Sequence, residues 1–218
     1  MPAVNLPNSI TLTRIFSVPL LIWILSSRFH GPDGEKEILA SALFIAASIT
    51  DGIDGYLARK RGQITTMGML LDPLADKLLI AAAFVTLVQF NPSLVPVWMA
   101  VVIIGREFLV SGLRSIAASE GFTIEASELG KFKMLVQIVS VVAVILDHRW
   151  KEWPIYQNYF FPVHAIAWMS VWFMVILSAV SAIDYFVAFW SKIDRQVVKR
   201  RRRAFVLSRR RKRDVPVT

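Results

Sequence analysis

Long apolar segments dominate this sequence, and four aspartates interrupt them within one short stretch. The stretch runs from Ser48 to Phe84 and reads SITDGIDGYLARKRGQITTMGMLLDPLADKLLIAAAF. Of the 218 residues, 55% are hydrophobic, and the mean hydropathy is +0.52. Such a composition is too apolar for an ordinary soluble domain and is typical of an integral membrane protein. A carboxylate at membrane depth is costly unless something compensates its charge, so the four aspartates need an explanation.

The apolar segments predict six transmembrane helices around one polar cavity and no second domain. The helices are expected at Asn8–Ser27, Ile38–Leu57, Met69–Phe90, Leu94–Ala117, Gly130–Leu146 and His164–Phe189. Crossing the hydrocarbon takes roughly 20 residues, so the shorter uncharged runs become spans only if their charged ends are also helical. The expected fold is all-α, with residues 1–190 as a six-helix membrane domain and residues 191–218 as a basic tail.

The distribution of charge predicts the topology. Twelve Lys or Arg and two Asp lie between Lys192 and Asp214, a net charge of +10, while the whole chain carries +9. An even number of spans places both termini on one side, and the positive-inside rule makes that side cytoplasmic. The charged ends of the helices then line a cavity that opens to the cytoplasm. We expect the tail to lie on anionic lipid; nucleic-acid binding through the tail is the weaker alternative, and nucleic acid is not an expected partner.

The four aspartates fall into two pairs with helical spacing. Asp51 and Asp54 are three positions apart, and Asp72 and Asp76 are four positions apart, so each pair shares one helical face. Four carboxylates brought together repel one another unless protons or cations neutralise them. Divalent ions with oxygen ligands fit this pattern, and two of them can share one carboxylate cage. Helix caps or interfacial salt bridges are the alternative interpretation.

Small residues and one arginine accompany the acids. Gly55, Ala58 and Gly68 leave room for a ligand or for another backbone, and the Arg59 guanidinium can bind phosphate through two donors. A divalent-cation transporter would use the same carboxylates, but it would need neither this arginine nor these small residues.

The spacing resembles the signature of the CDP-alcohol phosphotransferases, D-x2-D-G-x2-A-R-x8-G-x3-D-x3-D. Its eight fixed positions are matched by Asp51, Asp54, Gly55, Ala58, Arg59, Gly68, Asp72 and Asp76. The resemblance implies a six-helix membrane enzyme, a homodimer, that holds two divalent ions, Mg²⁺ or Mn²⁺, on the diphosphate of a CDP-linked donor. It implies that the four aspartates are metal ligands and that Asp76 is also the general base.

The same resemblance implies a site for the CDP-linked donor. Its residues would be Asp51, Asp54, Gly55, Ala58, Arg59, Thr65, Gly68 and Asp72. The segment NLPNSITLTR places Asn8 and Arg14 at the mouth of the first span, where the resemblance implies that they support this donor site. Helix capping is an adequate alternative for Asn8.

Four cations near the ends of the fourth and fifth helices indicate an anionic acceptor. They are Arg106, Arg114, Lys131 and Lys133. A phosphate monoester would need such residues and a neutral alcohol would not, although positive-inside placement alone could explain the last three. Arg106 lies deepest and should have an anionic partner, for which Glu107 is a poor candidate because adjacent helical residues do not face each other. No role is assigned to Glu107, Ser111 and Gln137.

Within the family, these segments resemble the phosphatidylglycerophosphate synthases of bacteria. The resemblance implies transfer of the phosphatidyl group from CDP-diacylglycerol to sn-glycerol 3-phosphate, with release of CMP, in phospholipid biosynthesis. It also implies a multi-pass protein of the bacterial inner (cytoplasmic) membrane whose termini and active site are cytoplasmic. Two other acceptors stay open, phosphatidylglycerol as in cardiolipin synthases and an inositol phosphate, because both also carry phosphate.

Overall fold

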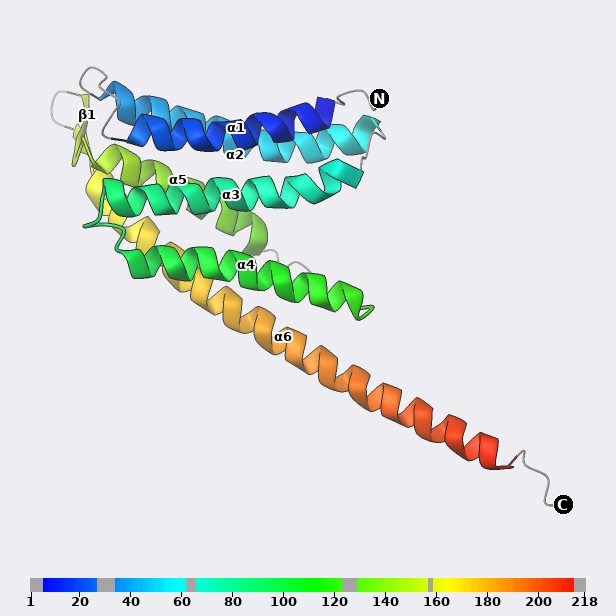
Figure 1. Cartoon of the computed structure of the whole chain (residues 1–218). Coiled ribbons are helices and arrows are strands. Elements are labelled where there is room, and N and C mark those ends of the chain that lie inside the picture. The colour runs from blue at the N-terminus through cyan, green and yellow to red at the C-terminus, as the bar shows by residue number, and fades with distance from the viewer. Residues whose placement is uncertain (1–5, 27–33, 62–65, 123–128, 157–158, 214–218) are drawn as a thin grey trace.

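Six α-helices make up most of the part of the chain that the computed structural model describes (Figure 1). The backbone is described at residues 6–26, 34–61, 66–122, 129–156 and 159–213, and the side chains at residues 12–26, 34–50, 71, 74–122, 132–153 and 160–193. The helices are α1 Leu6–Leu25, α2 Glu35–Arg61, α3 Thr66–Phe90, α4 Val97–Ser119, α5 Leu129–Asp147 and α6 Val163–Arg213. The predicted all-α body is therefore confirmed as predominantly helical.

The helices form a bundle in which some sequence neighbours and some helices further apart in the sequence pack side by side. Helix α1 packs against α2 and α3, α5 packs against α2 and α6, and α4 packs against α3 and α6. The end of α2 and the start of α3 lie at the same end of the bundle as the start of α1 and the end of α4 (Figure 1). This end carries the aspartate motif, and we call it the motif end. The long α6 projects beyond the other helices on this side (Figure 1).

A continuous apolar core joins all six helices, with α4 contributing the fully buried Ile103. Leu21 of α1, Phe44 of α2, Phe84 of α3, Val144 of α5 and Met174 of α6 have no exposed surface and belong to one cluster. Close van der Waals packing of such side chains holds helices together even in a membrane, where the lipid is as apolar as the core. The core therefore fixes the helices relative to one another and holds the polar residues nearer the motif end in place.

Large apolar side chains also cover the outside of the bundle. Phe16, Val101, Met169 and Ile183 are each more than 60% exposed, and they come from three different helices. By length and composition, one helical segment among the described residues is able to cross a membrane, Val163–Ile193, with a mean hydropathy of 2.1. The other predicted spans contain charged residues, and in α4 Arg106 and Glu107 lie near the middle of the helix.

The predicted helices lie within a few residues of the observed ones except at the end of α6. The sequence predicted an end at Phe189, whereas the helix continues to Arg213. No glycine or proline occurs in this stretch, and Lys and Arg are good helix formers, so nothing local terminates the helix. By contrast, α4 ends where Gly121 adopts a φ of 79°, with the Phe122 amide donating to Ala117 and the Gly121 amide to Ala118. Glycine suits this left-handed cap because it has no Cβ.

A short antiparallel hairpin was not predicted. Strand β1 (Trp153–Tyr156) pairs with β2 (Tyr159–Phe161) between α5 and α6. Aromatic residues favour strands, and the segment is too short for a helix with a buried face. The hairpin lies at the end of the bundle opposite the aspartate motif (Figure 1).

Candidate active site

The aspartate motif spans the end of α2 and the start of α3. Asp51 and Asp54 lie in α2, and Asp72 and Asp76 lie in α3, so the helical backbone that the pairwise spacing requires is present at all four positions. The side chain of Asp76 is described and is partly buried. The side chains of the other three aspartates lie outside the described residues.

Most of the predicted donor-site residues have a described backbone only. Gly55, Ala58 and Arg59 lie in α2, Gly68 lies in α3 and Asn8 lies in α1, whereas Thr65 is outside the described residues altogether. Arg14 is described, and its side chain is 2% exposed inside the bundle. The predicted donor-site roles therefore stay predictions.

Asp76 lines a small polar cavity between four helices. The cavity has a volume of about 160 Å³, and its walls are Ser48, Asp76, Ile80, Glu107, Lys133, Met134, Gln137 and Ile138. These residues come from α2, α3, α4 and α5. The fold thus brings a predicted general base and a predicted phosphate-binding lysine to one space of small-molecule size.

Glu107 connects two of the predicted phosphate-binding cations. Its carboxylate accepts a hydrogen bond from Lys133 Nζ, and Arg106 Nη1 lies 3.3 Å from the same oxygen. Arg106 Nη2 also donates to Ser181 Oγ of α6. The expectation that Glu107 would not pair with Arg106 was wrong, because the long guanidinium side chain can bend back toward an adjacent residue.

The cluster of Arg106, Glu107 and Lys133 carries an excess positive charge. Two cations share one carboxylate, and the side chains of Lys133 and Glu107 are only 10% and 16% exposed. In addition, Arg106 Nε is buried and has no hydrogen-bond partner among the described residues. A partly buried cluster of two cations and one carboxylate, with a donor that lacks a partner among the described residues, is suited to bind an anion.

Arg114, another predicted phosphate ligand, is not among the described lining residues of the cavity. Arg114 Nη2 donates to the Tyr185 hydroxyl at 3.0 Å, and its guanidinium lies 5.7 Å from the centre of that ring. Arg114 therefore joins α4 to α6 nearer the motif end. Lys131 lies in the first turn of α5, and its side chain is outside the described residues.

The donor set around the motif fits a hard metal ion. The chain has no cysteine, and the motif supplies only carboxylates, which are ligands that Mg²⁺ and Mn²⁺ prefer. Within the described side chains no group of three His, Asp or Glu could hold a metal ion, but three of the four motif aspartates are outside that set.

Sequence reasoning did not assign several residues of this region. Ser181 and Tyr185 stand four positions apart on α6, so one face of that helix holds both arginines of α4. Gln137 is one helical turn beyond Lys133 and lines the same cavity. The i,i+4 spacing of these pairs was visible in the sequence, but their partners on other helices were not.

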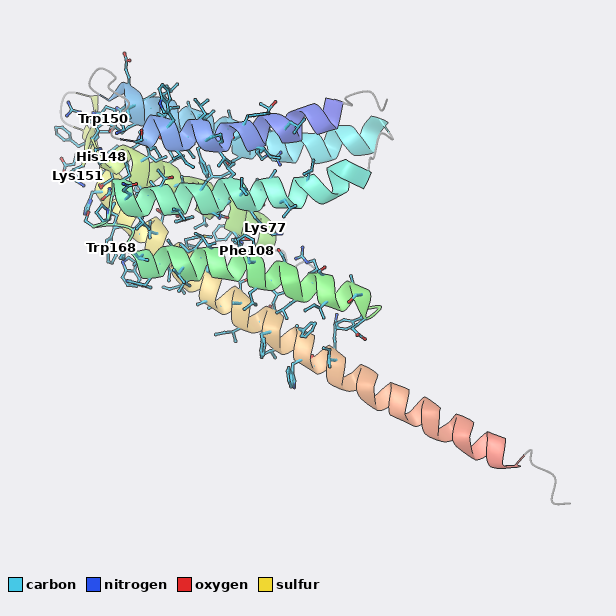
Figure 2. The ribbon with its side chains drawn as sticks, in the orientation of Figure 1. Lys77, Phe108, His148, Trp150, Lys151 and Trp168 are labelled. Carbon is cyan, nitrogen blue, oxygen red and sulfur yellow. The ribbon has the colours of Figure 1, made fainter. Side chains whose placement is uncertain are left out.

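A second polar cluster lies at the hairpin end, where Figure 2 shows His148, Trp150 and Lys151 together. The Asp147 carboxylate has no exposed surface and accepts hydrogen bonds from Asn91 at 3.0 Å, Lys151 at 2.6 Å and His164 at 2.7 Å. Burial raises the pKa of this carboxyl, but the hydrogen bonds from Lys151, Asn91 and His164 outweigh it and leave the pKa below its ordinary value. The cluster joins α3, α5 and α6 far from the motif and is structural in character.

Similar proteins agree with the motif. A Bacillus subtilis (strain 168) protein named CDP-diacylglycerol–glycerol-3-phosphate 3-phosphatidyltransferase is 43% identical over 197 residues, which cover 87% of this chain and 97% of that protein. A Rickettsia bellii protein of the same name is 33% identical over 84% of this chain and 94% of its own length. A Mycobacterium tuberculosis protein named probable phosphatidylglycerophosphate synthase is 34% identical over 83% of this chain and 79% of its own length.

A solved structure shares the fold. The crystal structure of Mycobacterium tuberculosis phosphatidylinositol phosphate synthase matches with a TM-score of 0.61 and 16% identity, covering 84% of this chain and 88% of that one. The same protein has also been solved in complex with manganese and citrate. Residues 4–183 of this chain match the sequence profile of the CDP-alcohol phosphatidyltransferases. With the aspartate motif, the shared fold and relatives of more than 30% identity over most of its length, this chain belongs to the CDP-alcohol phosphatidyltransferase family.

Proposed function

We propose that this protein transfers the phosphatidyl group from CDP-diacylglycerol to sn-glycerol 3-phosphate, yielding phosphatidylglycerophosphate and CMP. The observation that carries the proposal is the cavity that Asp76 and Lys133 share, beside a cluster in which Arg106 and Lys133 contact the same carboxylate. A small acceptor with a phosphate and a free hydroxyl matches this combination of groups. The names of the relatives from Bacillus and Rickettsia supply the same pair of substrates.

Lys133 and Arg106 are the acceptor-phosphate ligands in this proposal. Arg106 reaches the cluster from α4 and Lys133 from α5, so a phosphate between them would contact both helices. Arg114 and Lys131 lie nearer the motif end and would attract the anionic acceptor toward the cavity. The acceptor phosphate would compete with Glu107 for the two cations, and Glu107 would hold them in place when no acceptor is bound.

The motif aspartates would hold the donor through divalent metal. Asp51, Asp54, Asp72 and Asp76 are the proposed ligands, on two helices that meet at the motif end. When bound, the metal ions would neutralise the diphosphate and stabilise the departing CMP. Gly55, Ala58 and Gly68 leave room for the nucleotide, and Arg59 supplies a further phosphate contact. Thr65, Asn8 and Arg14 complete the proposed donor site.

Asp76 would act as the general base. The acceptor hydroxyl gives its proton to the Asp76 carboxylate while its oxygen forms a bond to the β-phosphorus of CDP-diacylglycerol. The bond between that phosphorus and the oxygen of CMP breaks, and CMP leaves with the electron pair. Lys133 orients the acceptor by its phosphate, so that its hydroxyl points toward Asp76.

The remaining parts of the proposal concern the membrane. We place all six helices across the bacterial inner membrane, with both termini and the cavity cytoplasmic and the basic tail on anionic lipid. The exposed apolar side chains on α1, α4 and α6 support this placement, because a soluble protein rarely exposes so much apolar surface. We also propose a homodimer, two metal ions per subunit and no nucleic-acid partner.

One assay tests the proposed function. Purified protein with CDP-diacylglycerol and Mg²⁺ or Mn²⁺ is offered glycerol 3-phosphate, inositol phosphate, inositol, serine and phosphatidylglycerol, and CMP release and the lipid product are measured. We expect transfer to glycerol 3-phosphate and loss of all transfer in excess chelator. Preferred transfer to phosphatidylglycerol or inositol phosphate would replace the proposed acceptor. Full turnover with chelator would remove the metal from the proposal, and metal uptake without transfer would indicate a cation transporter.

A further inference from the structure

Gln137 is a buried amide whose nitrogen has no hydrogen-bond acceptor among the described residues. Its side chain is 5% exposed, and its Nε2 has no hydrogen-bond partner among the described residues. A buried donor without a partner is costly, so such a group in a native protein calls for an explanation. The residue also lines the cavity that contains Asp76 and Lys133, which places the amide beside the space for a small ligand.

The other polar groups on the cavity wall have known partners or other uses. Ser48 Oγ donates to the Phe44 carbonyl at 2.8 Å, and Lys133 binds Glu107. Asp76 and Glu107 are carboxylates and accept hydrogen bonds when ionised. Among the described lining residues, Gln137 is therefore the one that offers an uncommitted donor to a neutral hydroxyl.

The position of Gln137 indicates which hydroxyl it would bind. Lys133 and Gln137 are four positions apart on α5 and share one helical face. Asp76 reaches the same cavity from α3. An acceptor with its phosphate at Lys133 and its reacting hydroxyl at Asp76 would occupy this cavity, which Gln137 also lines.

We infer that Gln137 is a specificity-determining residue whose amide donates a hydrogen bond to the second, non-reacting hydroxyl of a polyol phosphate. This inference rests on the proposed function and adds to it the part of the acceptor that the cations and the base do not recognise. A site built to bind a hydroxyl rejects an analogue that lacks it, because the site's own polar group is then buried without a partner. The protein thus recognises three groups of the acceptor: the phosphate, the reacting hydroxyl and the middle hydroxyl.

The test compares two acceptors that differ by this hydroxyl alone. Glycerol 3-phosphate and 3-hydroxypropyl phosphate both carry the phosphate and the terminal hydroxyl, and kcat/KM is measured for each with CDP-diacylglycerol. We expect the wild-type protein to prefer glycerol 3-phosphate by about tenfold or more. In Gln137→Met, which keeps the size of the side chain and removes its donor, the preference should fall to about twofold or less, mainly through loss of activity toward glycerol 3-phosphate.

Ser140→Ala is the matched control. Ser140 is buried one turn further along α5, donates to the Val136 carbonyl at 2.8 Å and does not line the cavity. This variant should keep the wild-type preference even if its stability changes. A Gln137→Met protein with the wild-type preference would overturn the inference.

The ratio of kcat/KM for the two acceptors in the wild-type protein tests the inference even if Gln137→Met does not fold. A ratio near one, with good activity toward glycerol 3-phosphate, overturns the inference and leaves the proposed function intact. No transfer to glycerol 3-phosphate at all would instead remove the proposed function, and the inference with it.

Discussion

Asp76 and Lys133 have opposite charges and lie far apart in the sequence, yet they face one cavity. Their proposed roles differ because their surroundings differ. Lys133 is held by Glu107, which itself contacts Arg106, so the cations are fixed before an acceptor arrives. Such preorganisation lowers the cost of ordering side chains during binding. Predictions at this scale concern the base and the deepest arginine.

Asp76→Asn should retain donor binding and lose turnover. The amide can still offer one oxygen to a metal ion but cannot take the proton of the acceptor, and loss of a general base typically lowers kcat by roughly 10²–10⁴-fold. CMP release measures turnover, and binding of CDP-diacylglycerol in the presence of Mn²⁺ measures the donor site. A near wild-type rate would exclude Asp76 as the base. Asp51→Asn is the comparison, because it should weaken metal and donor binding first.

Arg106→Ala should raise KM for glycerol 3-phosphate and leave KM for CDP-diacylglycerol nearly unchanged. Losing a charge-assisted contact to phosphate costs roughly 2 kcal/mol, or about thirtyfold in affinity. Steady-state kinetics with each substrate varied in turn provide the measurement. Arg149→Ala, an exposed arginine at the hairpin end, is the charge-matched control and should have neither effect. An increase confined to the CDP-linked donor would instead assign Arg106 to the nucleotide site.

At the scale of the elements, α5 connects the two polar regions of the bundle. Lys133 and Gln137 line the cavity near its start, and Asp147 closes its other end. The sequence predicted this helix from its apolar run and predicted Lys133 from its charge. It did not predict Asp147 as a buried junction, because the partners Asn91 and His164 lie on other elements.

The difference between local spacing and contacts with other elements explains which further features could be predicted from the sequence. Helix positions and the aspartate pairs follow from local spacing, which the sequence contains. Three arrangements depend on how helices pack and how side chains rotate. They are the contact between Arg106 and Ser181, the bend of Arg106 toward Glu107, and the Gln137 amide nitrogen that has no partner among the described residues. Local spacing carries no information about these arrangements.

Asp147→Asn should lower the free energy of unfolding by about 1–2 kcal/mol at neutral pH, because it replaces a buried carboxylate that accepts charge-assisted hydrogen bonds. The lowered pKa gives the sign of the pH dependence: the carboxylate stabilises the folded state at pH above 3.8, and this contribution is lost as the pH falls through the lowered pKa. Thermal unfolding in detergent, measured from pH 7 to pH 3, should give curves for the two proteins that converge at acidic pH. A constant difference would contradict a role for the charge.

The whole molecule combines an apolar exterior with a polar cavity near one end. Helix α6 has 51 residues, and at 1.5 Å per residue it is about 75 Å long, more than twice the roughly 30 Å of membrane hydrocarbon. Its basic C-terminal part must therefore extend beyond the hydrocarbon unless the helix lies along the surface. The apolar segment Val163–Ile193 is the part suited to the membrane.

The absence of cysteine allows a clean test of the six-span topology. Ser119→Cys places a single thiol at the exposed end of α4, and Glu152→Cys places one in the exposed region before the hairpin. In cells whose outer layers have been removed but whose inner membrane is intact, a membrane-impermeant thiol reagent should label the Glu152→Cys protein. The protein with Ser119→Cys should be labelled only after lysis. Labelling of both in intact cells, or the reverse pattern, would contradict the proposed topology.

Removal of the residues after Trp190 should affect orientation in the membrane more than catalysis. The deleted segment contains the net charge of +10 and none of the motif residues. Each Lys or Arg near an anionic surface contributes about 1 kcal/mol, and basic residues next to a span direct it to the cytoplasmic side.

The truncated protein should keep the wild-type kcat and KM in detergent, whereas the Ser119→Cys assay in cells should detect a larger inverted fraction. Replacing Lys199 and the four following arginines with glutamine tests charge apart from helix length, because glutamine also favours helix. If charge is the cause, this variant should be inverted nearly as often as the truncated protein. Complete loss of transferase activity in a truncated protein that is folded and inserted would contradict this prediction and assign the tail to the catalytic unit.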